Sequence, residues 1–145
     1  MRFGGDVLYQ LPSVTPLQCM GFVLAGEGDV LVVDGGTKAE TDQLEELLEK
    51  LGGKVTGWIL THAHFDHIQA LIEILKRGKI KIGFVSYHFP DIEYVERVEL
   101  RDGRIAVVRE LESELSARGQ KVVCPEKGRA FRAGHFSVLP LSDGN

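Results

Sequence analysis

The chain has 145 residues, enough for one domain, and its hydrophobic content of 43% and charged content of 26% are ordinary for a globular protein. The net charge of −4, without a basic block, does not indicate a nucleic-acid-binding face, although a nucleic-acid substrate is not excluded. No apolar run approaches the ~20 residues of a membrane span, and the first six residues lack the apolar segment of a signal peptide. We therefore expect one domain over residues 1–145, in the cytoplasm, with Cys19 and Cys124 as reduced, buried thiols.

The first third of the chain predicts strands and one helix. Residues 7–11 alternate weakly and predict a strand, and the apolar runs 20–24 and 30–33 predict a hairpin with glycines in its turn. Thr37 and Glu40 fit a capping box, which predicts that a helix follows. This helix is expected to bury Leu44, Leu47, Leu48 and Leu51, to keep its acidic face in solvent, and to end at Gly52 and Gly53.

The centre of the chain carries a dense group of metal-ligand residue types. Residues 55–60 predict a buried strand, and residues 68–77 predict a helix that stops at Gly78. Between them lie three histidines and an aspartate. In extended backbone His62 and His64 point the same way, whereas Asp66 and His67 fall where the chain turns into the helix. Zinc and similar ions bind imidazole nitrogen and carboxylate oxygen.

This spacing predicts a metal site whose ligands are His62, His64, Asp66 and His67, with one ion on the first pair and a second ion on the second pair. A polar surface loop is the alternative interpretation. The expected cofactor is one or two divalent ions, with zinc favoured over manganese or iron.

The last third predicts further strands, helices and a second hairpin. Residues 80–85 predict a strand, after which Tyr87 and His88 either line the substrate pocket or pack as ordinary aromatic side chains. Residues 91–99 predict a loop or short helix, and residues 104–118 predict an amphipathic helix that ends at Gly119. A short strand over 122–124 and a hairpin from 130–132 and 136–141 follow. His135, at the hairpin turn, is expected to be exposed and remote from the metal.

The run His-x-His-x-Asp-His after an apolar strand resembles the signature of the metallo-β-lactamase superfamily. The resemblance implies an α/β fold, a four-layer αββα sandwich with two sheets inside and helices outside. It also places Asp34, in an aspartate-glycine turn, beneath the metal loop. Asp34 is then expected to orient His62 or to stiffen the loop, and a plain turn is the alternative.

The family resemblance also predicts that the C-terminal part of the sandwich is missing. Members usually supply a third metal histidine, a bridging aspartate and a last histidine after the position of Leu141, whereas this chain ends at Asn145. We expect a truncated domain, a piece of a longer protein, or a half-domain completed by a partner. An open sheet edge then favours a homo-oligomer.

The chain's C-terminal residues resemble one branch of the family. Asn145 stands nearest to the position of the third histidine, as in the nuclease domain of competence DNA-uptake proteins, and is expected to line the substrate site. This resemblance favours a phosphoester substrate. Another small molecule, such as an amide, thioester or lactam, stays open.

The function predicted from these observations is a metal-dependent hydrolase that uses metal-bound hydroxide. Asp66 is expected to be the catalytic residue that orients the attacking water and accepts its proton, while the histidines serve as ligands. Because the ligand set is incomplete, a non-catalytic metal-binding or interaction module is the alternative. A structural piece with an empty site is a third interpretation.

Overall fold

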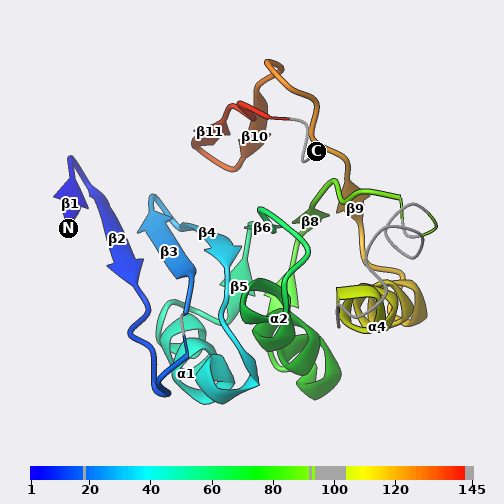
Figure 1. Cartoon of the computed structure of the whole chain (residues 1–145). Coiled ribbons are helices and arrows are strands. Elements are labelled where there is room, and N and C mark those ends of the chain that lie inside the picture. The colour runs from blue at the N-terminus through cyan, green and yellow to red at the C-terminus, as the bar shows by residue number, and fades with distance from the viewer. Residues whose placement is uncertain (18, 92, 94–103, 143–145) are drawn as a thin grey trace.

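A mixed sheet of seven strands forms the centre of the structure, a computed structural model that describes residues 1–17, 19–91, 93 and 104–142. The strand order is β1-β2-β3-β4-β6-β8-β9, in which β1 to β4 are antiparallel neighbours and β4, β6, β8 and β9 run parallel (Figure 1). The strands are β1 Arg2–Phe3, β2 Asp6–Gln10, β3 Gly21–Gly26, β4 Asp29–Asp34, β6 Gly57–Ile59, β8 Val85–Ser86 and β9 Val122–Val123.

Helices cover one face of this sheet. They are the 3-10 turn η1 Lys38–Glu40 and the helices α1 Thr41–Lys50, α2 Phe65–Arg77 and α4 Arg104–Ala117. The main core lies between them and the sheet, where Leu44, Leu71 and Leu111 pack around Trp58, all four fully buried. Burial of apolar side chains between the two layers is the main contribution to stability here. None of the described helices is long and apolar enough to cross a membrane.

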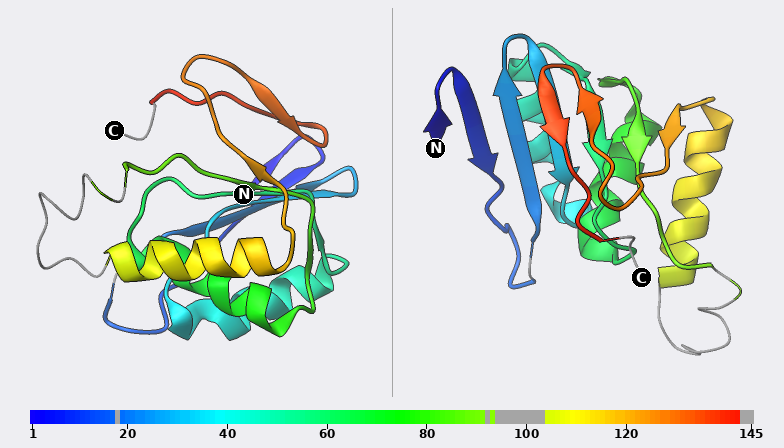
Figure 2. Two further views of the ribbon diagram at one scale, coloured as in Figure 1. Left: turned by 90° about the vertical axis from the view of Figure 1, so that its right-hand side faces the viewer. Right: turned by 90° about the horizontal axis from the view of Figure 1, so that it is seen from above.

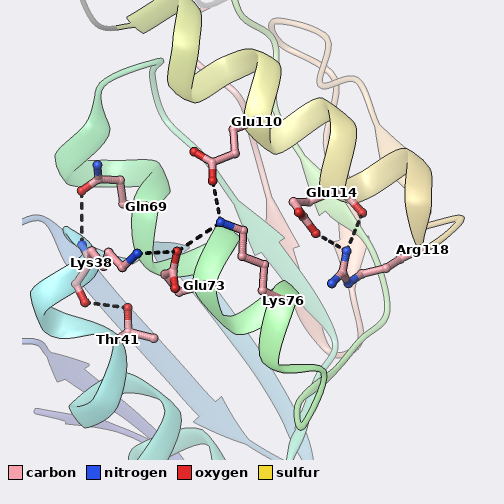
Figure 3. Close-up of polar contacts among 8 residues, drawn as sticks. All are labelled: Lys38, Thr41, Gln69, Glu73, Lys76, Glu110, Glu114 and Arg118. Carbon is pink, nitrogen blue, oxygen red and sulfur yellow. Dashed lines mark hydrogen bonds and ion pairs between the residues drawn. The ribbon is translucent and has the colours of Figure 1, made fainter.

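Ion pairs at the surface link successive helices (Figure 3). Glu73 of α2 pairs with Lys38 at 3.2 Å, and Lys76 of α2 pairs with Glu110 of α4 at 2.5 Å. The Gln69 side-chain oxygen of α2 accepts a hydrogen bond of 3.3 Å from the backbone N–H of Lys38. Exposed pairs of this kind contribute about 0–1 kcal/mol each, so they fix the orientation of the helices more than they stabilise the fold.

The opposite face of the sheet carries a small hairpin, β10 Phe131–Ala133 and β11 Phe136–Val138 (Figure 2). A second apolar cluster joins it to the sheet through buried Leu31, Phe84, Ala133 and Phe136. The described residues thus supply three layers: helices, main sheet and hairpin. The α/β class is confirmed, and no helix lies over the outer side of the hairpin among the described residues.

The local sequence signals are largely confirmed. Strands β3 and β4 form the predicted hairpin, Thr37 and Glu40 form both hydrogen bonds of the capping box, and Gly78 ends α2 with a positive φ of 68°. Helix α2 begins at Phe65, three residues before the predicted start. The acidic face of α1 is not wholly solvated, because Glu45 is buried and pairs with Arg77 and Lys79. The expected burial of both thiols is wrong, since Cys124 is exposed and Cys19 is only half-buried.

Two predicted strands are interrupted. Residues 54–59 form β5 Lys54–Val55 and then β6, and residues 81–86 form β7 Lys81–Ile82 and then β8. Strands β5 and β7 pair with each other in parallel. Gly83 lies at the second interruption, where the chain passes so close to a neighbouring segment that a Cβ on it would lie 2.5 Å from the backbone oxygen of Thr56. Of the predicted loop at 91–99, only residues 91 and 93 lie within the described residues.

Candidate metal centre

The candidate metal loop, residues 61–67, lies at the carboxyl edge of the parallel strands. Strands β4, β6 and β8 pair in register, with Val33 opposite Ile59 and Ile59 opposite Ser86. Their last residues therefore meet at one edge, and the segments that leave the strands are neighbours. Asp34 ends β4, the metal loop follows β6, and Tyr87 follows β8. This register places the candidate residues that follow three separate strands at one edge of the sheet.

Asp34 and Thr61 form the base of the loop. One carboxylate oxygen of Asp34 accepts the backbone N–H of Thr61 at 2.9 Å, and the other accepts the Thr61 hydroxyl at 2.8 Å. Asp34 is 2% exposed and has a positive φ of 59°, a conformation that aspartate tolerates better than most residues. The turn is therefore more than a plain connection, because its side chain stiffens the start of the metal loop.

His67 is the most buried histidine of the loop. Its Nδ1 lies 2.9 Å from Oδ2 of Asp34, and the two side chains are only 6% and 3% exposed. Its Nε2 faces the other way and lies 3.6 Å from Oδ2 of Asp66. A carboxylate that binds one ring nitrogen fixes the ring and leaves the second nitrogen available, an arrangement common behind metal-ligating histidines.

The three imidazoles of the loop are in contact. The ring centroids of His62 and His67 are 3.8 Å apart, and those of His62 and His64 are 4.6 Å apart. The backbone N–H of His67 donates to the carbonyl of His64 at 3.1 Å, which brings the loop back on itself. Burial, and then the neighbouring His67 and His64, lower the pKa of His62. His62 is therefore neutral near pH 7, the form that binds metal.

The residue types of the loop suit a divalent ion, but their side chains do not converge on one point. Three imidazoles in contact, a partly exposed Asp66 and a supporting Asp34 form a suitable donor set. Among the described residues, however, no three histidine, cysteine, aspartate or glutamate side chains converge in a metal-holding geometry. The ligand set His62, His64, Asp66 and His67 stays a prediction.

The contacts of Asp34 go to the base of the loop and to His67. Within the described residues its hydrogen bonds and ion pairs go to Thr61 and His67, and none goes to His62. Asp34 ends β4 beside the start of the loop, whereas the His62 ring packs against the ring of His67. His62 is reached indirectly, since its Nδ1 is 3.1 Å from the Thr61 hydroxyl. The sequence reasoning gave Thr61 no role, although it directly precedes the first histidine.

The weaker substrate-lining candidates fall in different places. His88 lines a cavity of about 290 Å³ together with Thr61, Phe131 and Val138. Tyr87 lies in a neighbouring cavity of about 450 Å³, which His88 also lines and which contains none of the metal loop, and its ring is 4.7 Å from that of Phe89. Asn145 lies outside the described residues. Substrate contact by these three stays a prediction.

His135 lies far from the metal loop, as expected, but it is not exposed. Its side chain is 20% exposed and sits between Asp6 and Asp29. Asp29 and Asp34 are the first and last residues of β4. The cluster around His135 therefore lies at one end of this strand, and the cluster of loop histidines lies at the other. At ~3.3 Å per residue the clusters are roughly 16 Å apart along the strand. The expectation of an exposed His135 is wrong, because both carboxylates come from distant parts of the sequence.

Comparison with known proteins identifies similar sequences and folds. The family model described as "Metallo-beta-lactamase superfamily" matches residues 14–137. The Bacillus subtilis (strain 168) protein named "Probable metallo-hydrolase YqgX" is 32% identical over 69 residues, which cover 48% of this chain and 32% of that protein. A likeness to competence DNA-uptake proteins is not confirmed and stays a prediction.

Solved structures share the fold at low sequence identity. The metallo-beta-lactamase fold protein YhfI from Bacillus subtilis is 16% identical with a TM-score of 0.55, and the match covers 92% of this chain and 50% of that one. The metallo-beta-lactamase family protein TTHA1429 from Thermus thermophilus is 24% identical with a TM-score of 0.51, and the match covers 90% and 48%. The chain thus spans about half the length of these two structures.

Proposed function

The chain belongs to the metallo-beta-lactamase superfamily, and from this premise we propose that it serves metal-dependent hydrolysis, with residues 61–67 as the metal site. The observation that carries the proposal is the contact between Asp34 and His67, which leaves Nε2 of a buried histidine facing the Asp66 carboxylate. Burying an aspartate is costly unless its oxygens are bonded, so the pair is a built support for the loop. The chain spans only part of the length of its relatives, so its hydrolytic activity is itself part of what we propose.

The proposed ligands are His62 and His64 for one ion and Asp66 and His67 for a second, with zinc as the proposed ion and manganese or iron as alternatives. When bound, such an ion supplies an acidified water and polarises a carbonyl or phosphoryl oxygen. The chain's own contribution is orientation. Thr61 and Asp34 hold the loop against β4, and Asp34 keeps the His67 ring in one tautomer.

Asp66 is the proposed catalytic residue. It stands in the first turn of α2 with its side chain 21% exposed, so a water molecule can reach it from the loop side. Its role would be to orient the attacking water and accept its proton at a carboxylate oxygen. Its neighbour Phe65 is 46% exposed and leaves the approach to the loop partly apolar.

Phosphoesters are the proposed substrate class. This choice depends on the resemblance of the C-terminal residues to the competence branch, and Asn145 lies outside the described residues. A panel of bis-p-nitrophenyl phosphate, a chromogenic β-lactam and a thioester, assayed with added zinc or manganese, tests it. Faster turnover of the phosphodiester supports the proposal, and preference for either other substrate overturns the assignment of class.

The hydrolase proposal itself is tested by the metal dependence of turnover in wild type and Asp66→Asn. We expect chelator-sensitive hydrolysis that is lost in the variant, while the circular dichroism spectrum is unchanged. Equal turnover in the variant, or turnover that survives metal removal, contradicts the role of this loop.

One observation favours a second candidate, a metal-binding or interaction module without turnover. The described residues contain no group of three converged ligands, and an efficient catalytic site holds its ion with three protein ligands and an open position. Metal titration distinguishes the two functions. Binding of zinc without hydrolysis of any panel substrate supports the module, whereas stoichiometric binding with turnover supports the enzyme.

A further inference from the structure

His135 is held between two carboxylates at the end of β4 opposite the metal loop. Its Nε2 lies 3.1 Å from Oδ1 of Asp6, and its Nδ1 lies 3.1 Å from Oδ2 of Asp29. Its backbone N–H also donates to Oδ2 of Asp29 at 2.8 Å. The partners come from the first residues of β2 and β4, whereas His135 forms the turn between β10 and β11. The contacts therefore join the hairpin to the main sheet.

The surroundings leave room for this cluster only because two neighbours are glycines. A Cβ on Gly26 would lie 1.8 Å from Oδ1 of Asp6, and a Cβ on Gly134 would lie 2.0 Å from Cγ of Asp29. Asp29 is further held by the hydroxyl of Thr56, which donates to its other oxygen at 2.9 Å. The two carboxylates are thus fixed in place, and any side chain at either glycine would displace them.

Negative charges act on the imidazole, from Asp6 of β2, Asp29 of β4 and Glu27 of the β3–β4 turn. Partial burial opposes the charged form, but the hydrogen bonds to Asp29 and Asp6 outweigh it and raise the pKa of His135 above its usual 6.5. Both ring nitrogens face carboxylate oxygens, so both act as donors only when the ring is protonated.

The hairpin held by this cluster forms one wall of a cavity near the metal loop. Phe131 and Val138 line the cavity of about 290 Å³ from the hairpin side, and Thr61 and His88 line it from the sheet side. Figure 2 shows the hairpin lying over the face of the sheet opposite the helices. The turn that carries His135 and two of the residues that line the cavity therefore belong to the same hairpin.

We propose that the imidazolium of His135, clamped between Asp6 and Asp29, is a pH-sensitive latch that holds hairpin β10–β11 against the main sheet. A raised pKa in the folded state means that the latch is at full strength below pH 6.5 and weakens as the pH rises through the folded value. At the acid end the pKa of Asp29 is lowered from 3.8, chiefly by the backbone N–H of His135, so the latch persists down to that region. The hairpin is closed in weak acid and loosens in base.

The test is amide hydrogen exchange of β10 and β11 as protection factors between pH 5.5 and 9, normalised to amides of β4. We expect protection of the hairpin to fall several-fold, up to about tenfold, over this range, as suits a partly exposed ion pair. In His135→Asn protection should be low at every pH. The control Asp42→Asn removes an ionisable group of α1 that is 86% exposed and pairs with Arg77 of α2, so it should keep the wild-type profile.

A second measurement keeps the proposal testable if His135→Asn proves unstable. The His135 ring is titrated by NMR in wild type and in Asp6→Asn, which removes one carboxylate and leaves Asp29 in place. The imidazole should titrate above 6.5 in wild type and closer to 6.5 in the variant. Hairpin protection that is flat with pH in wild type, or a His135 titration unaffected by Asp6→Asn, overturns the latch.

Discussion

The carboxylate of Asp34 and the imidazole of His67 are joined at 2.9 Å in the most enclosed part of the candidate metal centre. The contact spans the end of β4 and the first turn of α2, elements separated in sequence by the whole of α1, β5 and β6. Both side chains are buried, so neither has water as an alternative partner. The pair therefore sets the position of the metal loop relative to the sheet.

Asp34→Asn tests this support. Asparagine keeps the size of the side chain and tolerates the positive φ of 59°, but it presents an amide group to His67 and Thr61 in place of the carboxylate. We expect zinc affinity to fall by ~10- to 100-fold, as for other partners behind ligating histidines. Competition against a chromophoric chelator gives the affinity. Asp42→Asn, at a carboxylate whose side chain is 86% exposed, is the control, and equal affinities in both variants would contradict the support.

His64→Ala tests the ligand assignment directly. His64 is half-buried and directly precedes α2. Replacing its side chain with a methyl group should therefore leave the core intact and abolish metal binding. Metal content after dialysis against zinc, measured by plasma emission, decides the outcome, with the circular dichroism spectrum as the check on folding. His88→Ala is the matched control and should retain its zinc. Full metal content in His64→Ala would show that the ligands are misassigned.

The sequence predicted those features that depend on local pattern. Apolar periodicity indicated the β3–β4 hairpin and the buried leucines of α1, and Gly78 marked the end of α2. The density of histidines placed the candidate metal loop after a strand. Each of these patterns involves residues that are close in sequence, so it can be recognised without knowledge of the fold.

Features that depend on distant pairs were not predictable. His135 reaches partners 106 and 129 residues away, and Asp34 reaches Thr61 across the strand pairing. A histidine at a hairpin turn is ordinarily exposed, and only the arrangement of β2 and β4 gives it two carboxylates. The close approach of Gly83 to the backbone of Thr56 likewise involves two separate segments of the chain.

Gly83→Ala tests whether this close approach requires glycine at position 83. The new Cβ would meet the backbone oxygen of Thr56 at 2.5 Å, and a backbone atom cannot move aside as a flexible side chain can. We expect a loss of about 1–3 kcal/mol in the free energy of unfolding, measured by urea denaturation. Gly5→Ala is the control, because no atom lies within 4 Å of its added Cβ. If both variants unfold at the wild-type urea concentration, the contact does not limit residue 83 to glycine.

Glu40→Gln tests the buried capping box and gives a pH dependence. Burial opposes ionisation of Glu40, but hydrogen bonds from Thr37 and Val14 outweigh it and lower its pKa from 4.5. A lowered folded pKa stabilises the protein above pH 4.5 and loses its effect as the pH falls through the folded value.

Glutamine cannot accept hydrogen bonds from all these donors, so we expect the substitution to cost about 1–3 kcal/mol of stability at pH 7, with the difference from wild type narrowing below pH 4.5. Urea denaturation at a series of pH values measures both effects, with Glu46→Gln, at a side chain 66% exposed, as the near-neutral control. A Glu40→Gln protein as stable as wild type at pH 7 would mean that the carboxylate does not hold the η1 turn.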